Sequence, residues 1–275
     1  MSKTNQSKKC ADPTTENKKI ESGKAENNRT EKNTTEKNKT GKKEYFGTVC
    51  EIQRNSYNIL VENKTIHAKL KGNFFRENEE LPVVGDNVAF LPNENGDSLI
   101  TSVCERKSVL KRPYAADHSM DNGKEQVMVA NVDYVFIVSS LNDNYNFNRI
   151  ARYVSMTLQG NAIPVVILTK ADLCSNPGRY ASEIENLSEQ VKVHSVSALY
   201  GIGMDELNKY LQPGKTIAIL GSSGVGKSTL VNALVQEDVM KTSEIRESDS
   251  KGRHTTTHRQ MIELLNGARI IDTHG

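Results

Sequence analysis

The chain reads Ile-Ala-Ile-Leu-Gly-Ser-Ser-Gly-Val-Gly-Lys-Ser-Thr over residues 217–229. The four apolar residues predict a buried strand, the Gly-x-x-x-x-Gly-Lys-Ser run predicts a phosphate loop, and the residues after it favour a helix. Glycines let backbone N–H groups turn toward phosphate oxygens, and the helix N-terminus adds positive potential. The nucleotide-binding residues expected from this stretch are Gly221, Ser222, Ser223, Gly224, Val225, Gly226, Lys227, Ser228 and Thr229.

Two side chains of this loop carry specific chemistry. We expect Lys227 to reach the β- and γ-phosphates and to act as a catalytic cation. The hydroxyl of Ser228 is expected to ligate Mg²⁺, a hard cation that prefers oxygen ligands.

The sequence around the loop alternates strand-like and helix-like segments. The run at 132–138 is continuously apolar except for one acidic residue, which is typical of a buried parallel strand, and apolar residues from Phe147 to Leu158 follow at helical spacing. Strands are expected at 132–138, 163–168, 191–193, 217–220, 261–265 and 268–271, the last two as a hairpin around Asn266-Gly267. Six strands with crossover helices predict an α/β domain over residues 131–275.

A different pattern occupies residues 44–105. Short β-like runs at 45–49, 57–61 and 66–70 are separated by turn residues, which predicts a small β-barrel of the OB type. Barrels of this kind often bind oligonucleotides, although fold alone does not establish function. Residues 106–130 are polar and charged, and we expect a flexible linker there.

The first 43 residues are expected to be a disordered basic tail. They carry 12 Lys or Arg against 6 acidic residues, a net charge of +6 in a chain whose total is +2. Such a segment cannot bury enough apolar surface to offset its ordering entropy. A solubilising tail and an arm that contacts RNA both fit this composition.

Two short motifs are candidates for reading the nucleotide base. Thr169, Lys170, Ala171 and Asp172 follow the strand at 163–168, where α/β proteins place their ligands. An Asp carboxylate there accepts hydrogen bonds from guanine N1–H and N2–H₂, a pair that adenine lacks. Ser197-Ala198 follows the next strand and offers a backbone N–H to guanine O6. Each motif alone is short enough to arise by chance, and their order along the chain gives them weight.

Further candidates lie after the phosphate loop. Asp272 ends the last predicted strand and is expected to hold Mg²⁺, while the N–H of Gly275 is expected to meet the γ-phosphate. In the loop at 252–257, Thr256 is expected to complete the Mg²⁺ ligands and His254 to position the attacking water. A threonine-rich turn and an ordinary loop histidine are the alternative interpretations.

The order of these motifs is circularly permuted, because the base-reading motifs precede the phosphate loop. In that order, and in the runs at 84–88, 106–113, 201–207 and 252–257, the chain resembles the ribosome small subunit-dependent GTPase A family, known as RsgA or YjeQ. The resemblance implies an OB barrel, a permuted GTPase domain and a zinc domain. It also implies GTP hydrolysis during late maturation of the small ribosomal subunit, with that subunit and its rRNA as partners. We expect a cytoplasmic monomer.

Three positions depart from the family pattern. Thr169 stands where Asn is more usual, His274 stands where Pro is usual, and the sequence stops at Gly275 with no Cys/His cluster. We therefore expect a C-terminally truncated GTPase domain with reduced activity and no zinc site. The sequence also contains no apolar stretch long enough to span a membrane. A non-hydrolysing RNA-binding protein that retains a guanine-nucleotide pocket is the rival hypothesis.

Overall fold

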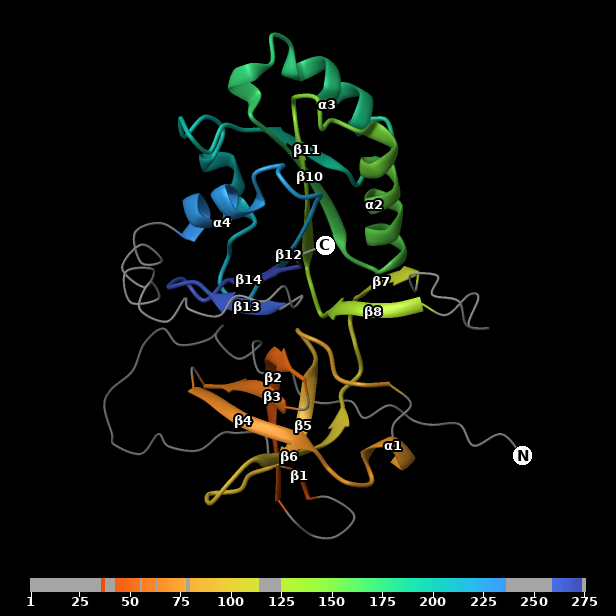
Figure 1. The fold of residues 1–275 in the computed structure, drawn as a ribbon, viewed down its shortest axis with the longest axis vertical. Helices are drawn as coiled ribbons and strands as arrows, with labels where there is room; N and C mark the ends of the chain where they lie inside the picture. The colour runs from red at the N-terminus through yellow and green to blue at the C-terminus, as the bar shows by residue number, and fades with distance from the viewer. Residues whose placement is uncertain are drawn as a thin grey trace, which may run out of the picture. The chain divides into compact units, whose positions relative to one another are not determined.

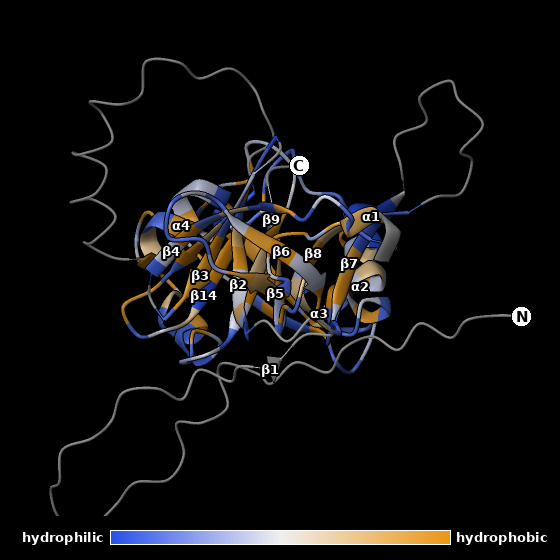
Figure 2. Ribbon diagram, turned by 90° about the horizontal axis from the view of Figure 1, so that it is seen from below, coloured by the Kyte–Doolittle hydropathy of each residue, from blue (hydrophilic) through white to orange (hydrophobic). Residues whose placement is uncertain are grey.

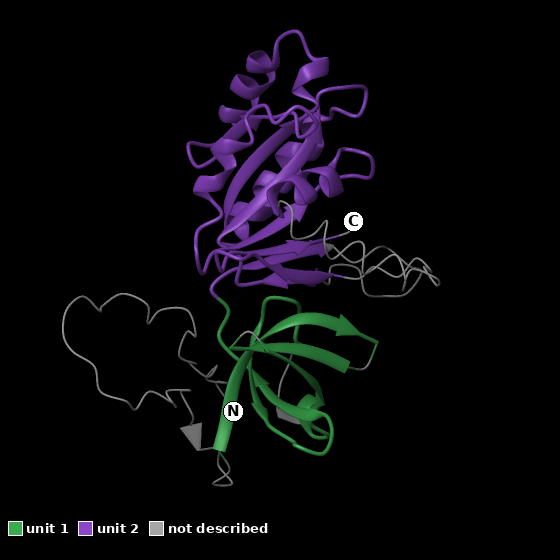
Figure 3. Cartoon of the chain, turned by 90° about the vertical axis from the view of Figure 1, so that its left-hand side faces the viewer, with its two compact units in different colours: residues 1–106 green, residues 107–275 purple. Residues whose placement is uncertain are grey.

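The computed structural model divides into two compact units, residues 1–106 and 107–275 (Figure 3). The structure describes residues 36–37, 43–54, 56–62, 64–77, 80–113, 125–235 and 259–273. The predicted tail at 1–43 lies almost entirely outside these ranges. No helix among the described residues is long and apolar enough to cross a membrane.

The first unit contains a closed five-stranded barrel. Strand β2 pairs antiparallel with both β3 and β5, β3 pairs with β4, β4 lies parallel to β6, and β6 returns to β5. The strands therefore follow the order β2-β3-β4-β6-β5 around the barrel, and β5 closes onto β2. This is the strand order of OB-type barrels, so the predicted barrel is confirmed. Its elements are β1 (Glu36–Lys37), β2 (Lys43–Gln53), β3 (Ser56–Val61), β4 (Lys64–Leu70), α1 (Phe74–Glu77), β5 (Asn87–Leu91) and β6 (Ser98–Val103) (Figure 1).

Alternating side chains of these strands fill the barrel. Val49, Ile59, Val88 and Ile100 are fully buried in one apolar cluster. The strands approach closely at Gly47, where an added Cβ would lie 2.4 Å from the Ile59 side chain. Figure 2 shows the apolar residues concentrated in the strands rather than in the connecting loops. This is the burial expected when a small sheet closes on itself.

The second unit is an α/β sheet with the strand order β11-β10-β9-β12-β14-β13. The first five strands are parallel, and β13 is antiparallel to β14 in the hairpin predicted around Asn266-Gly267. All six predicted strands are present. The elements are β9 (Tyr134–Ser140), α2 (Phe147–Gln159), β10 (Ile163–Thr169), η1 (Ala171–Leu173), α3 (Pro177–Glu185), β11 (Lys192–Ser195), η2 (Asp205–Lys209), β12 (Thr216–Leu220), α4 (Lys227–Val235), β13 (Gln260–Glu263) and β14 (Arg269–Asp272).

The stretch expected to be a flexible linker contains two paired strands. Residues Val109–Pro113 form β7, which pairs antiparallel with β8 at Glu125–Ala130, and both belong to the second unit. Leu110 and Val129 are fully buried, and an added Cβ on Gly160 at the end of α2 would lie 2.4 Å from the Val109 carbonyl oxygen. Packing against α2 therefore orders strands whose polar flanks suggested a loop.

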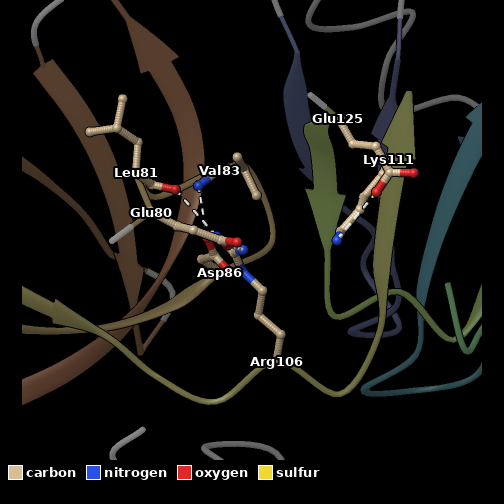
Figure 4. Close-up of polar contacts among 7 residues, drawn as sticks. All are labelled: Glu80, Leu81, Val83, Asp86, Arg106, Lys111 and Glu125. Carbon is tan, nitrogen blue, oxygen red and sulfur yellow. Dashed lines mark hydrogen bonds and ion pairs between the residues drawn. The ribbon is translucent and has the colours of Figure 1, made fainter. Parts of the chain in front are cut away.

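The last residue of the first unit is fixed within the barrel (Figure 4). The guanidinium of Arg106 contacts both carboxylate oxygens of Asp86 at 2.7 and 2.8 Å and also pairs with Glu80. Asp86 is fully buried and accepts a hydrogen bond from the Val83 N–H at 2.7 Å. Burial raises the pKa of Asp86, while Arg106 and the Val83 N–H oppose that rise. Figure 4 also shows the exposed Lys111–Glu125 ion pair between β7 and β8.

Candidate functional site

The phosphate loop joins β12 to α4 at the carboxyl end of the sheet. Gly224 and Gly226 adopt φ values of +77° and +93°, which L-residues with a side chain rarely adopt. At Gly221 an added Cβ would lie 2.5 Å from the carbonyl oxygen of Val138 on the neighbouring strand β9. Two of the three glycines are therefore required by their backbone conformation and the third by the close approach of β9. A loop that wraps around a phosphate needs such glycines.

Lys227 is the first residue of α4, and its side chain turns back into the loop. Its Nζ donates to the carbonyl oxygens of Gly221 and Ser222, both at 2.8 Å. Burial lowers the pKa of Lys227, and the charge of Asp272 opposes that shift. The ammonium is thus held where the loop curls around it, while the side chains of Ser228 and Thr229 in the first turn of α4 are exposed.

Asp272 lies at the end of β14, directly beside the strand that leads into the phosphate loop. It pairs in register with Ile219 of β12. The next residue, Thr273, is buried, and its hydroxyl donates to the Ile219 carbonyl at 2.6 Å. A serine hydroxyl and a carboxylate both offer the hard oxygen donors that Mg²⁺ prefers, so the chemistry of Ser228 and Asp272 is compatible with that ion.

Thr256, His254 and Gly275 lie outside the described residues, as does the whole run at 252–257.

The loop after β10, which is predicted to read the base, is bonded directly to the phosphate loop. Thr169 is buried, and its hydroxyl donates to the Val225 carbonyl at 2.6 Å, while Lys170 Nζ donates to the Gly224 carbonyl at 3.3 Å. Lys170 has a φ of +57°, and the chain then enters the short helix η1 that carries the exposed Asp172. The threonine hydroxyl at position 169 thus supplies a bond between the two loops.

The loop that carries Ser197 and Ala198, the second loop predicted to read the base, lies beside the first. Val196 N–H donates to the Leu168 carbonyl at 2.8 Å, and Ala171 N–H donates to the Val196 carbonyl at 3.1 Å. The N–H of the buried Ser197 is already used, since it donates to the Ile202 carbonyl at 2.9 Å. Of the two residues predicted to read guanine O6, Ala198 is therefore the better donor.

A polar network around the buried His194 is not predicted by the sequence. His194 of β11 bonds through Nδ1 to the Glu206 carboxylate at 2.7 Å and through Nε2 to the Tyr210 hydroxyl at 2.9 Å. Burial lowers the pKa of His194. Because Glu206 and Tyr210 follow the loop and His194 precedes it, the network holds the two ends of the 197–204 loop together. A single histidine in a four-residue strand gave no signal of it.

Arg149 of α2 was also missed. Its Nη1 donates to the hydroxyl of Ser222, the second residue of the phosphate loop, at 2.7 Å. No motif connects residues 149 and 222, which lie on different crossovers of the sheet, so only the folded structure brings them together.

Comparison with known proteins agrees with this arrangement. The RsgA GTPase family model matches residues 103–275, and the RsgA N-terminal domain model matches residues 47–100. Among named relatives, Small ribosomal subunit biogenesis GTPase RsgA 2 of Listeria monocytogenes is 42% identical over 232 residues, covering 84% of this chain and 64% of the relative. The RsgA protein of Methanosarcina acetivorans is 42% identical over 229 residues, covering 83% of this chain and 59% of the relative. The chain thus spans less than two thirds of the length of both relatives.

Two solved structures share the fold. YjeQ from Thermotoga maritima aligns with a TM-score of 0.62 at 28% identity, covering 84% of this chain and 75% of that one. YloQ, described as a circularly permuted GTPase, aligns with a TM-score of 0.55 at 23% identity and covers 84% of this chain and 71% of that one. The predicted fold, a permuted α/β GTPase domain preceded by an OB-like barrel, is confirmed.

Proposed function

This chain belongs to the RsgA family of GTPases, and from that membership we propose that it binds GTP and GDP with Mg²⁺, hydrolyses GTP and acts in late maturation of the small ribosomal subunit. The names of its relatives, small ribosomal subunit biogenesis GTPases, support the assignment.

One observation carries the nucleotide assignment: the base-reading and phosphate-binding loops are bonded to each other. The bonds from Thr169 to Val225 and from Lys170 to Gly224 fix the two loops within one site. The carboxylate of Asp172 would then accept hydrogen bonds from guanine N1–H and N2–H₂, and the Ala198 N–H would donate to O6. Adenine presents no matching pair, so the site would favour guanine.

The remaining residues have roles at the phosphate end. Lys227 would shift from the loop carbonyls to the β- and γ-phosphates. Ser228 and Asp272 would hold Mg²⁺, with Thr256 as the further ligand, and the bound ion would neutralise charge on the phosphate oxygens. The Gly275 N–H would contact the γ-phosphate, and His254 would orient the attacking water.

The barrel is the proposed contact with rRNA of the small subunit. Its strand order is that of barrels that commonly bind oligonucleotides, and the basic composition of residues 1–43 supports the same polyanionic partner. We propose a monomer that acts in the cytoplasm.

Nucleotide titration and turnover together test the proposal. The full chain should bind GTP and GDP at least tenfold more tightly than ATP, about 1.4 kcal/mol. It should also release phosphate from GTP, with a rate measured with and without purified small subunits. Binding of GTP without any turnover would favour the rival hypothesis, an RNA-binding protein that only retains the pocket. Equal affinity for ATP and GTP would contradict the assignment of Asp172.

A further inference from the structure

Two cations converge on one residue of the phosphate loop. Lys227 Nζ donates to the carbonyl oxygen of Ser222 at 2.8 Å, and Arg149 Nη1 donates to the hydroxyl of the same residue at 2.7 Å. Lys227 belongs to the loop itself, whereas Arg149 comes from α2, the helix that follows the neighbouring strand β9. The phosphate-loop pattern accounts for Lys227 but assigns nothing to Arg149.

The charge of Arg149 has no carboxylate partner within the described part of the chain. Its side chain is half-buried, and the Ser222 hydroxyl is the one acceptor that it contacts there. A guanidinium carries five N–H donors, so most of its hydrogen-bonding capacity is unused. A partly desolvated cation that lacks a counter-ion is costly, and an anion bound beside it would offset that cost.

The position of Arg149 in its helix is a second, independent reason to expect a bound anion. Arg149 lies in the first turn of α2, where its own N–H is capped by the side chain of Asn146. The N-terminus of a helix carries partial positive charge, so a cation there is unfavourable and an anion is favoured. The first turn of α2 contains no acidic residue. A residue that opposes the local electrostatics of its helix is the kind expected at a functional site.

The contacts of the loop also indicate which end of the nucleotide Arg149 faces. Lys170, from the base-reading loop, bonds to Gly224, which marks the base side of the phosphate loop. Lys227, which serves the β- and γ-phosphates in such loops, bonds to Gly221 and Ser222 at the other side. Arg149 contacts Ser222 and therefore lies at the terminal-phosphate side.

We propose that Arg149 is a second phosphate-binding cation that distinguishes a nucleoside triphosphate from a diphosphate. Its hydrogen bond to Ser222 holds it beside the loop, and in the nucleotide complex it pairs with the terminal phosphate, for which the planar guanidinium offers parallel donors. The inference rests on the proposed function, since it requires that the loop binds GTP.

Isothermal titration of the full chain with GTPγS and with GDP tests the proposal. Arg149→Gln should weaken GTPγS binding at least tenfold and change GDP binding by less than twofold, and Arg149→Lys should recover part of the loss. The matched control is Arg152→Gln, which removes an exposed cation one turn further along α2 and should change neither affinity. Ser222→Ala removes the hydrogen bond but keeps the charge of Arg149, so it should not reproduce the selective loss of GTPγS binding.

Several outcomes would overturn the proposal. If Arg149→Gln weakens GTPγS and GDP equally, or if Ser222→Ala reproduces its effect, then Arg149 only supports the loop. If the wild-type chain binds tightly and Arg149→Gln leaves the ratio of GTPγS affinity to GDP affinity unchanged, the role of Arg149 is rejected and the proposed function stays intact. A wild-type chain that binds neither nucleotide would reject both. Thermal unfolding should show Arg149→Gln at least as stable as the wild type, because a cation leaves the helix N-terminus.

Discussion

In the barrel, the guanidinium of Arg106 lies against the carboxylates of Asp86 and Glu80, whereas in the α/β unit the charges of Lys227 and Arg149 lie against carbonyl and hydroxyl oxygens of the phosphate loop. Among the described residues neither Lys227 nor Arg149 forms an ion pair. This difference in hydrogen-bond acceptors distinguishes two roles of a partly buried cation. A cation neutralised within the protein contributes to the fold, and one left without a carboxylate is suited to an anionic ligand.

The largest effect on stability is expected from breaking the barrel pair. Asp86→Asn would leave the guanidinium of Arg106, whose side chain is only 10% exposed, without its main partner. Loss of one partner of a buried ion pair costs about 3 kcal/mol or more. Urea unfolding followed by fluorescence should show this loss, while GTP affinity should stay within twofold of wild type. The exposed pair of Lys69 and Asp97 supplies the control, since Asp97→Asn should cost less than about 1 kcal/mol.

The converse experiment removes the cation that lacks an ion pair. Lys227→Ala should weaken GTP binding by about 3 kcal/mol, more than a hundredfold, and should abolish turnover, because it removes the charge that faces the β- and γ-phosphates. Its unfolding free energy should change little, since the lysine contacts only two loop carbonyls. If Lys227→Ala is destabilised but hydrolyses GTP normally, then Lys227 serves the fold rather than the nucleotide, and the nucleotide site lies elsewhere.

A smaller and more selective effect is expected at the base. Asp172→Asn should lower the preference for GTP over xanthosine triphosphate at least tenfold, about 1.4 kcal/mol, because an amide matches the oxygen that xanthine carries at position 2. The side chain is exposed, so stability should be unchanged. Competition titrations with the two nucleotides measure the ratio, and an unaltered preference would remove Asp172 from the site.

The smallest effect concerns the pH dependence of the α/β unit. Burial lowers the pKa of His194, so the unfolded chain binds a proton more readily than the folded one. The neutral histidine therefore contributes to the free energy of unfolding above its ordinary pKa of about 6.5, and this contribution is lost as the pH falls below that value. The charged groups facing the ring are Glu206, Glu185 and Lys209. Urea midpoints between pH 8 and pH 5 should fall more steeply for the wild type than for His194→Gln, and parallel curves would refute the assignment.

The sequence predicted the strands of the α/β unit because each is marked by an unusual local pattern. The run before the phosphate loop and the hairpin around Asn266-Gly267 follow from apolar continuity and turn chemistry within a few residues. The strands β7 and β8 were mistaken for a linker because their polar flanks dominate the local composition. These two strands form because Leu110 and Val129 pack into the core and because Gly160 of α2 lets the helix approach closely. Local composition does not reveal either contact.

The sequence by itself determined the nucleotide loop, the order of its motifs and the barrel, because each depends on residue types at fixed short spacing. Only the tertiary structure decided which residues surround the loop. Arg149 reaches Ser222 across 73 positions of sequence, and Thr169 reaches Val225 across 56. Parallel strands joined by crossovers bring their carboxyl ends to one edge of the sheet. Contacts at that edge depend on strand order, which no local pattern encodes.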